Sequence, residues 1–420
     1  MMLTKSSFSR RSLNLKTDFL RRRNNSMAEG IKIVYIDYNF NDQRYPNRKE
    51  DGDGFFTHGF GGLYSRQFKK YHPEFEVECW KADSRINAIY EKTIEGILFR
   101  IFPAVSLGKS GLFSVSLLQH LIREKKEGRR IVFNVSSIRH LLFYSVALFL
   151  RKHPLVVQHH GEAPVKYKIK ISSGLKYFFY RLQLPLEKKC LSHVDLFYIL
   201  DDDIRKYLPS SLRVKKSTTG VDEQLFFPVE KNQAREKLNL DVNKKYLLHI
   251  GRLNYVKRAD WLIDVYNEIK KERDDVQLII GGAEKSDELY EYARQSGVLL
   301  YGMIPQKELY LFFSASEMYI LPAYSSALPF LGIGMLPVQA MLCNVPVVGQ
   351  SLRNVDQEII DKVGILVNNK DELKEAVIKI LNGEKTFTGL REIAIASYSW
   401  KNIAARTRED YLAMAKKYYN

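Results

Sequence analysis

The chain has 420 residues, of which 45% are hydrophobic and 27% charged, an ordinary globular composition with enough length for two domains. Its formal net charge is +17 and its pI is near 9.4, so we expect an anionic partner. Charge alone does not say whether that partner is nucleic acid, phospholipid or a nucleotide sugar. No apolar run reaches the ~18 residues of a membrane-spanning helix, which predicts a soluble or peripheral protein.

The first 26 residues carry seven lysines and arginines against one acid, Asp18, and show no periodic apolar pattern. They end at Met27, just before the first convincing strand. One interpretation is a basic disordered arm or targeting peptide, and the other is an over-predicted start with Met27 as the true first residue. We favour the second, because the first strand of such a fold normally begins within a few residues of the N-terminus.

The three cysteines, Cys79, Cys190 and Cys343, lie far apart and have neither a CxxC nor a disulfide-framework spacing. This fits a reducing compartment, so we expect a cytoplasmic protein. We interpret all three as small buried apolar residues.

Short β-rich runs alternate with helical stretches along the whole chain. In the first half the predicted strands are Ile31–Ile36, Val77–Trp80, Ile131–Val135, Leu155–Gln158 and Asp195–Leu200. In the second half they are Tyr246–Ile250, Val276–Ile280, Val298–Tyr301, Met318–Leu321, Val345–Val348 and Ile365–Val367. Such alternation predicts parallel sheets joined by crossover helices.

The alternation breaks between about Lys215 and Lys244, where Gly- and Pro-containing sequence is followed by a Lys- and Asn-rich stretch. We therefore expect an α/β protein with two Rossmann-like, doubly wound domains that face each other across a cleft. The predicted domains cover residues 27–215 and 216–398. Ligands of such domains bind at the carboxyl ends of the strands.

Glycines follow the first strand after a long polar loop, in the sequence Gly59-Phe60-Gly61-Gly62. Gly61 and Gly62 would let the backbone approach a phosphate or sugar closely at a helix N-terminus. The alternative is a flexible turn with no ligand. The dinucleotide fingerprint G-x-G-x-x-G is absent here, which argues against a dehydrogenase.

His160 follows the fourth strand, in the sequence His159-His160-Gly161-Glu162. A histidine at that position can hydrogen-bond a sugar hydroxyl or a phosphate oxygen, although a purely structural role is equally compatible with the sequence. The run Asp201–Asp203 after the next strand resembles an acidic metal motif, but acids at this point also cap a helix and complement its dipole. We favour the cap, and we discount Asp51–Gly54 as a calcium loop because further ligands are missing.

The most informative segments lie in the second half, at residues 251–257 (GRLNYVK) and 334–341 (GMLPVQAM). Both are typical of a strand end, a turn and the start of a helix. Together they bring Arg252, Lys257 and a helix N-terminus to a position where a diphosphate could bind. The pattern predicts an enzyme that handles a nucleotide-linked substrate.

With these motifs the chain resembles GT-B glycosyltransferases, in particular retaining glycosyltransferase family 4 (glycosyl transferases group 1), from about Ile31 to Tyr419. The most specific matches are Gly251-Arg252-Leu253 with Lys257, Gly220-Val221-Asp222 with Phe226 and Pro228, Gly334 with Pro337, and Ala340-Met341 before Val345-Pro346-Val347-Val348. Weaker matches are Gly61-Gly62, His160-Gly161 and Ser399-Trp400.

The resemblance implies that Arg252 and Lys257 grip the donor diphosphate and that His160 lies near the transferred sugar. It also implies donor contacts from the backbone around Gly61, Gly62, Gly334, Met335 and Leu336, and no metal or other cofactor. Residues 399–420 are expected to form a helix that crosses back to the first domain.

The departures from the family pattern concern two glutamates that usually flank the Gly334 loop. Leu331 and Gln339 occupy their places. A neutral amide at Gln339 makes weaker hydrogen bonds than a carboxylate, so nucleotide affinity would fall by about tenfold. Leu331 cannot bond a hydroxyl at all. Either the donor is an unusual sugar held by other groups, or catalysis is impaired.

The leading hypothesis is a glycosyltransferase of glycan or polysaccharide biosynthesis. It would move a hexose from a nucleoside diphosphate sugar to a glycan or lipid-linked acceptor, with retention of configuration. The alternative is a non-catalytic GT-B protein that serves as a partner or scaffold in glycan assembly. We expect no nucleic-acid partner, because only the net charge favours one.

Basic and aromatic residues interleave in one stretch of the first half, where this fold binds its acceptor. The stretch contains Lys166, Tyr167, Lys168, Lys170, Lys176, Tyr177, Phe178, Phe179 and Tyr180. Such a sequence suits an anionic membrane surface, with the protein peripheral on the cytoplasmic face. The alternative is that Phe178, Phe179 and Leu182 belong to the core side of a buried helix whose lysines are solvated.

Overall fold

The computed structural model describes residues 30–38, 52–107, 111–138, 141–322, 330, 333–352, 355 and 357–419. The predictions for residues 1–26, for Asp51 and for Leu331 lie outside these ranges. The structure divides into two compact units. The first domain comprises residues up to Ile199, Ile204–Lys215 and Ala404–Asn420; the second comprises Leu200–Asp203 and Lys216–Ile403.

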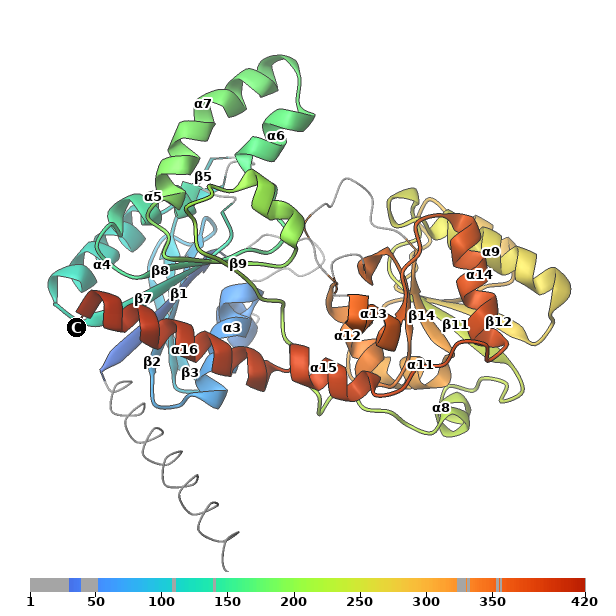
Figure 1. The fold of residues 1–420 in the computed structure, drawn as a ribbon. Coiled ribbons are helices and arrows are strands. Elements are labelled where there is room, and N and C mark those ends of the chain that lie inside the picture. The colour runs from blue at the N-terminus through green and yellow to red at the C-terminus, as the bar shows by residue number, and fades with distance from the viewer. Residues whose placement is uncertain are drawn as a thin grey trace, which may run out of the picture. The chain divides into compact units, whose positions relative to one another are not determined.

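The first domain is built on an eight-stranded sheet with the order β10-β9-β8-β7-β1-β2-β4-β3 (Figure 1). Its strands are β1 (Ile31–Tyr38), β2 (Glu76–Asp83), β3 (Tyr90–Ile94), β4 (Ile97–Pro103), β7 (Arg130–Ser136), β8 (Leu155–Gln158), β9 (Leu196–Ile199) and β10 (Val214–Lys216). The strands from β9 to β4 pair in parallel, and β3 returns antiparallel to β4. A separate short hairpin joins β5 (Val105–Ser106) and β6 (Leu112–Phe113).

Helices connect these strands as the alternation predicted. They are α2 (Asp53–Thr57), α3 (Gly59–Tyr71), α4 (Val115–Lys126), α5 (Leu141–Phe149), α6 (Val165–Ile171), α7 (Gly174–Leu191) and the 3-10 helix η3 (Asp202–Tyr207). The side chain of Ser114 caps α4 by accepting a hydrogen bond from the N–H of Leu117.

The second domain has a six-stranded parallel sheet with the order β13-β12-β11-β14-β15-β16. The strands are β11 (Lys245–Ile250), β12 (Val276–Gly281), β13 (Leu299–Tyr301), β14 (Met318–Leu321), β15 (Val347–Gly349) and β16 (Gly364–Ile365). The α-helices are α8 (Lys231–Lys237), α9 (Ala259–Glu272), α10 (Tyr290–Gln295), α11 (Leu309–Ala315), α12 (Met335–Leu342), α13 (Gln357–Val363), α14 (Lys370–Leu381) and α15 (Leu390–Tyr398). The 3-10 turns are η4 (Tyr255–Lys257) and η5 (Gln350–Leu352).

Apolar side chains cover both faces of this second sheet. Leu248 and Tyr319 pack into one buried cluster, whereas their chain neighbours Leu247 and Met318 pack into another. Because successive side chains of a strand point to opposite faces, a strand buried on both sides is an uninterrupted apolar run. This is why the central strands were predictable from the sequence.

The last helix, α16 (Trp400–Tyr419), contributes residues 404–419 to the first domain. Tyr411 is fully buried, accepts a hydrogen bond from Asn134 Nδ2 at 2.7 Å and donates one to the Tyr35 hydroxyl at 3.2 Å. The Tyr198 hydroxyl donates to Asp410 at 2.8 Å, and the Tyr419 hydroxyl donates to the carbonyl of Ile131 at 2.8 Å. The end of the chain is therefore part of the core of its first domain.

All three cysteines are free and buried, as predicted. The β3–β4 hairpin, the β5–β6 hairpin and β10 were not predicted. No helix among the described residues combines the length and the apolar character needed to cross a lipid bilayer.

Candidate active site

The turn after β11 carries Arg252, and a neighbouring loop fixes the position of this side chain. Its Nε donates to Asp287 Oδ1 at 2.8 Å, and Nη2 lies 3.6 Å from Glu284 Oε2. Asp287 also accepts hydrogen bonds from the N–H groups of Leu253 and Glu284. Burial alone would raise the pKa of Asp287, but these N–H groups and the guanidinium hold it below its usual range. These two acids therefore fix the orientation of the Arg252 side chain.

Lys257 closes the same turn. The side chain of Asn254 caps the 3-10 turn η4 by accepting a hydrogen bond from the Lys257 N–H at 2.9 Å. Arg258 then adopts the left-handed conformation, with φ of 53°, and α9 starts at Ala259. Burial lowers the pKa of the half-buried Lys257 ammonium. A partly desolvated cation of this kind gains more from an anionic ligand than a fully solvated one does.

The second motif forms α12, which follows β14. Gly334 precedes the helix with a φ of 77°, a conformation that favours glycine. Met335 and Leu336 supply N–H groups of the first turn, and Pro337, which has no N–H, follows them. Because β14 pairs directly with β11, this helix N-terminus and the turn 251–257 both lie at the carboxyl edge of adjacent parallel strands.

Gln339 is 5% exposed, and its buried Oε1 atom has no hydrogen-bond partner in the part of the chain that the structure describes. An unpaired buried oxygen costs free energy unless a ligand or water donates to it. His249, on β11, has a similarly buried and unpartnered Nε2, while its Nδ1 lies 2.8 Å from the carbonyl of Ile320. Burial lowers the pKa of His249 to about 4, so its ring is neutral at pH 7. The predicted second-domain residues thus gather at one edge of one sheet.

Gly61 and Gly62 lie in the first turn of α3, where they are buried against neighbouring backbone and side chains. A Cβ at Gly62 would lie 2.0 Å from the carbonyl oxygen of Thr57, and one at Gly61 would lie 2.6 Å from the Cβ of Asp37. Close packing of α3 therefore requires both glycines, which gives them a structural reason independent of any ligand. Their contact with a donor remains a prediction.

His160 lies at the carboxyl end of β8, in contact with the first turn of α3. Its ring stacks on Phe60 with centroids 3.7 Å apart and an interplanar angle of 5°, and Tyr64 approaches at 5.8 Å. Both ring nitrogens are buried and have no hydrogen-bond partner among the described residues. Burial lowers its pKa to about 4, against the opposing charge of Glu162. The structure thus holds a neutral imidazole with an unused donor and an unused acceptor.

A buried charged pair supports this corner of the first domain. Asp37, at the end of β1, accepts hydrogen bonds from the N–H groups of Gly61 and Tyr38 at 2.6 and 2.8 Å. Burial raises the pKa of Asp37, and Lys81 with these two N–H groups opposes the rise. The Lys81 ammonium donates to the carbonyl of His58. The sequence analysis assigned no role to Asp37, Lys81 or Phe60. For Asp37 there was a signal, because it is an acid at the carboxyl end of a predicted strand.

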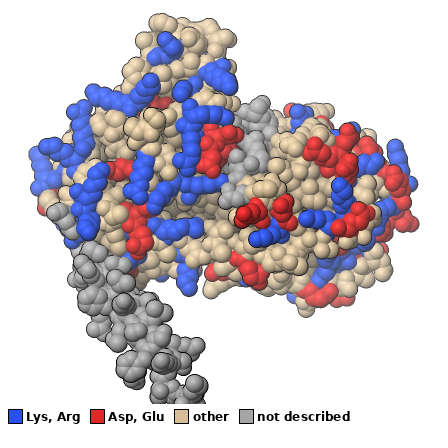
Figure 2. All heavy atoms as spheres, viewed as in Figure 1, with Lys and Arg blue, Asp and Glu red and all other residues tan. Residues whose placement is uncertain are grey.

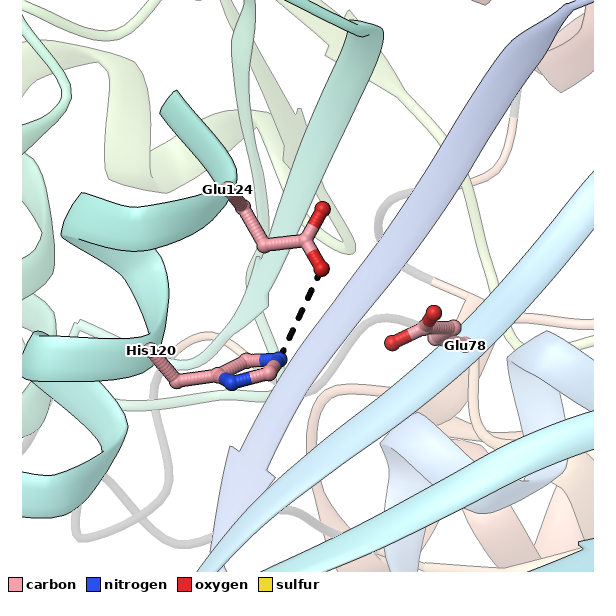
Figure 3. A group of neighbouring side chains, drawn as sticks. All are labelled: Glu78, His120 and Glu124. Carbon is pink, nitrogen blue, oxygen red and sulfur yellow. Dashed lines mark ion pairs between the residues drawn. The ribbon is translucent and has the colours of Figure 1, made fainter. Parts of the chain in front are cut away.

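The first domain also contains a buried cluster whose composition resembles a metal centre. The side-chain ligand atoms of Glu78, His120 and Glu124 lie within 4.8 Å of one another (Figure 3). However, Lys32 Nζ lies 2.6 Å from Glu78 Oε1 and 3.1 Å from both oxygens of Glu124, and Arg100 donates to Glu78. An ammonium and a guanidinium already neutralise the two carboxylates. We interpret the group as an ion-pair network that ties β1, β2 and β4 to α4.

The acids Asp201–Asp203 occupy a helix start. Asp201 Oδ1 accepts a hydrogen bond from the N–H of Asp203 at 2.8 Å, and η3 begins at Asp202. This arrangement fits the predicted helix cap.

A cavity of about 650 Å³ lies elsewhere, between α13, β16 and α14. Its lining includes Asp361, Glu372, Glu375 and Glu384, and it contains none of the predicted site residues. The four carboxylates outnumber the two lysines of the lining, Lys379 and Lys385, which disfavours a phosphate-bearing ligand, so we do not assign the donor site to this cavity.

Comparison with known proteins agrees with the motifs of the second domain. Residues 230–396 match the family described as Glycosyl transferases group 1. A D-inositol 3-phosphate glycosyltransferase of Catenulispora acidiphila is 26% identical over 228 residues, covering 50% of this chain and 52% of the relative. A probable sucrose-phosphate synthase of Thermosipho melanesiensis is 29% identical over 212 residues, covering 47% of this chain and 46% of the relative.

Solved structures extend the similarity to both domains. Sucrose-phosphate synthase from Thermosynechococcus elongatus superposes with a TM-score of 0.63 at 17% identity, covering 92% of this chain and 99% of that structure. The Anabaena protein Alr3699/HepE in complex with UDP gives a TM-score of 0.61 at 17% identity, with 91% and 100% covered. The fold is GT-B. The resemblance to group 1 glycosyltransferases is thereby confirmed, although nothing here singles out family 4.

The chain spans about half the length of the curated relatives it matches first, 52% and 43%. The matched part includes the turn 251–257 and α12, and it excludes His160 and the glycines of α3. Similarity to group 1 glycosyltransferases is therefore strongest where the candidate diphosphate site lies.

Proposed function

We propose that the protein is a retaining glycosyltransferase that moves a hexose from a nucleoside diphosphate sugar to a glycan or lipid-linked acceptor. The observation that carries the proposal is the turn 251–257. It brings two cations to the carboxyl edge of β11: Arg252, whose guanidinium donates to Asp287, and Lys257, whose backbone N–H is bound by the Asn254 cap. That edge is where a doubly wound domain binds its ligand. The match of residues 230–396 to group 1 glycosyltransferases supports the assignment.

The chemistry follows from charge. When the bond between sugar and diphosphate breaks, the departing nucleoside diphosphate takes up negative charge. Two cations held in place before the reaction, together with the N-terminus of α12, would stabilise that charge with little reorganisation. Because these groups supply the positive charge, we propose that the transfer needs no metal ion or other cofactor.

His160 is proposed to lie beside the transferred sugar. With a pKa lowered to about 4, the ring stays neutral at pH 7, so one nitrogen donates and the other accepts. A sugar hydroxyl can satisfy either nitrogen, and both lack partners in the structure. Donor contacts at Gly61, Gly62, Gly334, Met335 and Leu336 are proposed to be made by the backbone.

The direct test is a titration of the full-length protein with UDP, GDP and ADP and with their glucose derivatives, followed by assay of sugar release without acceptor. Binding accompanied by slow hydrolysis is the expected result. Binding without hydrolysis or transfer to any acceptor would favour the alternative, a scaffold that keeps a nucleotide site. No binding to any of these ligands would contradict the proposed transferase and favour a scaffold without a nucleotide site.

Gln339 allows a sharper test of the donor site. If its unpartnered Oε1 accepts from the ribose hydroxyls, Gln339→Glu should strengthen those bonds and tighten nucleotide binding by up to about tenfold. Calorimetric titration of the better-binding nucleotide measures the change. Gln339→Leu is the matched control, and it should weaken binding. Weaker binding by the Glu variant would show that the residue does not face the diol.

The proposal also covers the acceptor and the location of the protein in the cell. We place the protein in the cytoplasm, at the inner face of the membrane, in a pathway of glycan or polysaccharide biosynthesis. The support is the basic and aromatic character of α6 and α7 in the first domain, the half of the fold expected to receive the acceptor. A membrane-proximal acceptor would explain why these residues are exposed.

A further inference from the structure

Helix α7 exposes an apolar stripe that no other described residue of the first domain covers. Of its residues, Glu187, Cys190 and Leu191 are buried. The exposed fractions are 85% for Leu175, 61% for Phe178, 60% for Phe179, 66% for Leu182 and 38% for Leu186. These positions follow the spacing i, i+3, i+4, i+7 and i+11, so they share one face of the helix. The alternative of a buried core helix is therefore wrong for Phe178, Phe179 and Leu182.

Helices α6 and α7 form a hairpin (Figure 1), and its end carries a further exposed apolar residue. Ile171, the last residue of α6, is 63% exposed, and Gly174 turns the chain with a φ of 59°. A contiguous exposed apolar surface of large side chains is uncommon on soluble proteins and marks an interaction site. We call the exposed residues Ile171, Leu175, Phe178, Phe179, Leu182 and Leu186 the hairpin patch.

Positive charge surrounds the hairpin patch. Between Val165 and Leu191 there are seven lysines and arginines and one acid, Glu187. Glu187 is buried, where it accepts hydrogen bonds from the N–H of Val165 and the hydroxyl of Tyr144. The hairpin therefore presents no exposed acid of its own. Lys170, Lys176 and Arg181 are exposed beside the apolar stripe.

Basic residues are also distributed unequally between the two domains. Residues 27–215 contain 31 lysines and arginines against 20 acids, whereas residues 216–398 contain 22 against 25. On the face drawn in Figure 2, basic side chains gather over the first domain, and both signs mix on the second. The positive charge of the protein is thus carried by the domain that bears the hairpin patch.

We infer that the α6–α7 hairpin docks into the interfacial region of an anionic lipid bilayer, with the hairpin patch among the acyl chains and the flanking cations at the headgroups. A protein partner of comparable fit would need an acidic rim around an apolar groove. A lipid surface with anionic headgroups supplies both features without a specific shape. This inference rests on the proposed function only for its consequence, that the acceptor is membrane-proximal.

The test is co-sedimentation of the full-length protein with phosphatidylcholine vesicles containing a graded fraction of phosphatidylglycerol, at low and at high salt. The unmodified protein should bind in proportion to the anionic fraction and release at high salt. The charge variant Lys170→Gln/Lys176→Gln/Arg181→Gln and the apolar variant Leu175→Ser/Phe178→Ser/Phe179→Ser should each bind at least about tenfold more weakly.

Matched controls change the same chemistry elsewhere. Lys237→Gln/Lys271→Gln/Lys401→Gln removes the same charge from exposed positions of the second domain. Ile89→Ser/Val242→Ser/Met303→Ser replaces residues that are 47%, 39% and 71% exposed. Both controls should bind within about twofold of the unmodified protein, since neither touches the hairpin. The basic segment 1–26 is present in every variant and cannot cause a difference.

Three results would overturn the inference. One is the absence of vesicle binding at low salt, and another is an equal loss in the test and control variants. The third is a concentration-dependent dimer in sedimentation velocity that the apolar variant abolishes without any lipid binding, which would assign the hairpin patch to a second copy of the chain. Nucleotide titration of the same variants reports the second domain separately, so failure of the lipid site and failure of the donor site are distinguishable.

Discussion

Replacing Lys32 by Met should destabilise the first domain by about 3–5 kcal/mol at pH 7, the cost of removing one partner from a buried ion pair. Lys32 is 2% exposed, and its ammonium lies between Glu78 and Glu124. Met has nearly the same length but no charge, so it would leave two buried carboxylates close together with Arg100 as their remaining strong cation. Amide hydrogen exchange in β1 and β2 measures the opening of this domain without assuming that the two domains unfold together.

Lys92→Met is the matched control on the same sheet. Lys92 lies on β3 and pairs with Asp53 at 2.6 Å, but the two side chains are 48% and 59% exposed. A surface pair of this kind contributes about 1 kcal/mol or less. Equal losses in the two variants, or no change in Lys32→Met, would contradict the role we give to the buried network.

Lys257→Ala should weaken nucleoside diphosphate binding by ~1.5–3 kcal/mol, which is the contribution of a hydrogen bond to a charged group. In dissociation constant this is roughly ten- to hundredfold. The reason is the half-buried ammonium of Lys257, a residue whose backbone N–H is bound by the Asn254 cap in the turn after β11. Titration calorimetry with UDP measures the effect directly.

The control is Lys271→Ala, which removes an exposed lysine near the far end of α9. Its dissociation constant should match that of the unmodified protein, because Lys271 is at the opposite end of the helix from the turn. If both lysine variants bind UDP as the unmodified protein does, then the Lys257 ammonium faces solvent at a surface turn and does not contact the diphosphate. The diphosphate must in that case bind elsewhere.

The sequence predicted most of the strands that lie inside each sheet, because burial on both faces makes them mostly apolar. The exception is β4, which pairs on both sides and was not predicted. β3 gave no such signal, since Glu91, Lys92 and Thr93 are exposed at the sheet edge. The sequence also gave no signal for the turn between β3 and β4. Glu95 and Gly96 both take positive φ, 53° and 72°, as a tight hairpin requires, but Glu-Gly lacks the Asn or Asp that usually marks such a turn.

The candidate site likewise has parts that the sequence predicted and parts that it did not. Local spacing was enough to predict the turn 251–257 and the start of α12, because both are continuous in the chain. Nothing in a single sequence pairs Arg252 with Asp287, or Gly61 with Asp37, since the fold alone brings these residues together. For α7 the sequence allowed both an exposed and a buried face, and only the packing of the first domain distinguishes them.

The buried position of α16 has a consequence for how the protein is made. Ribosomes add residues at about 5–20 per second, and domains usually fold in the order of synthesis. Here Tyr411, Asp410 and Tyr419 complete the core of the first domain, although they are translated after the whole second domain. The second domain, which is nearly continuous in the chain, can finish folding while the first domain still lacks α16. Until α16 has been made, the nascent first domain therefore has an open flank on its sheet, which chaperones can reach.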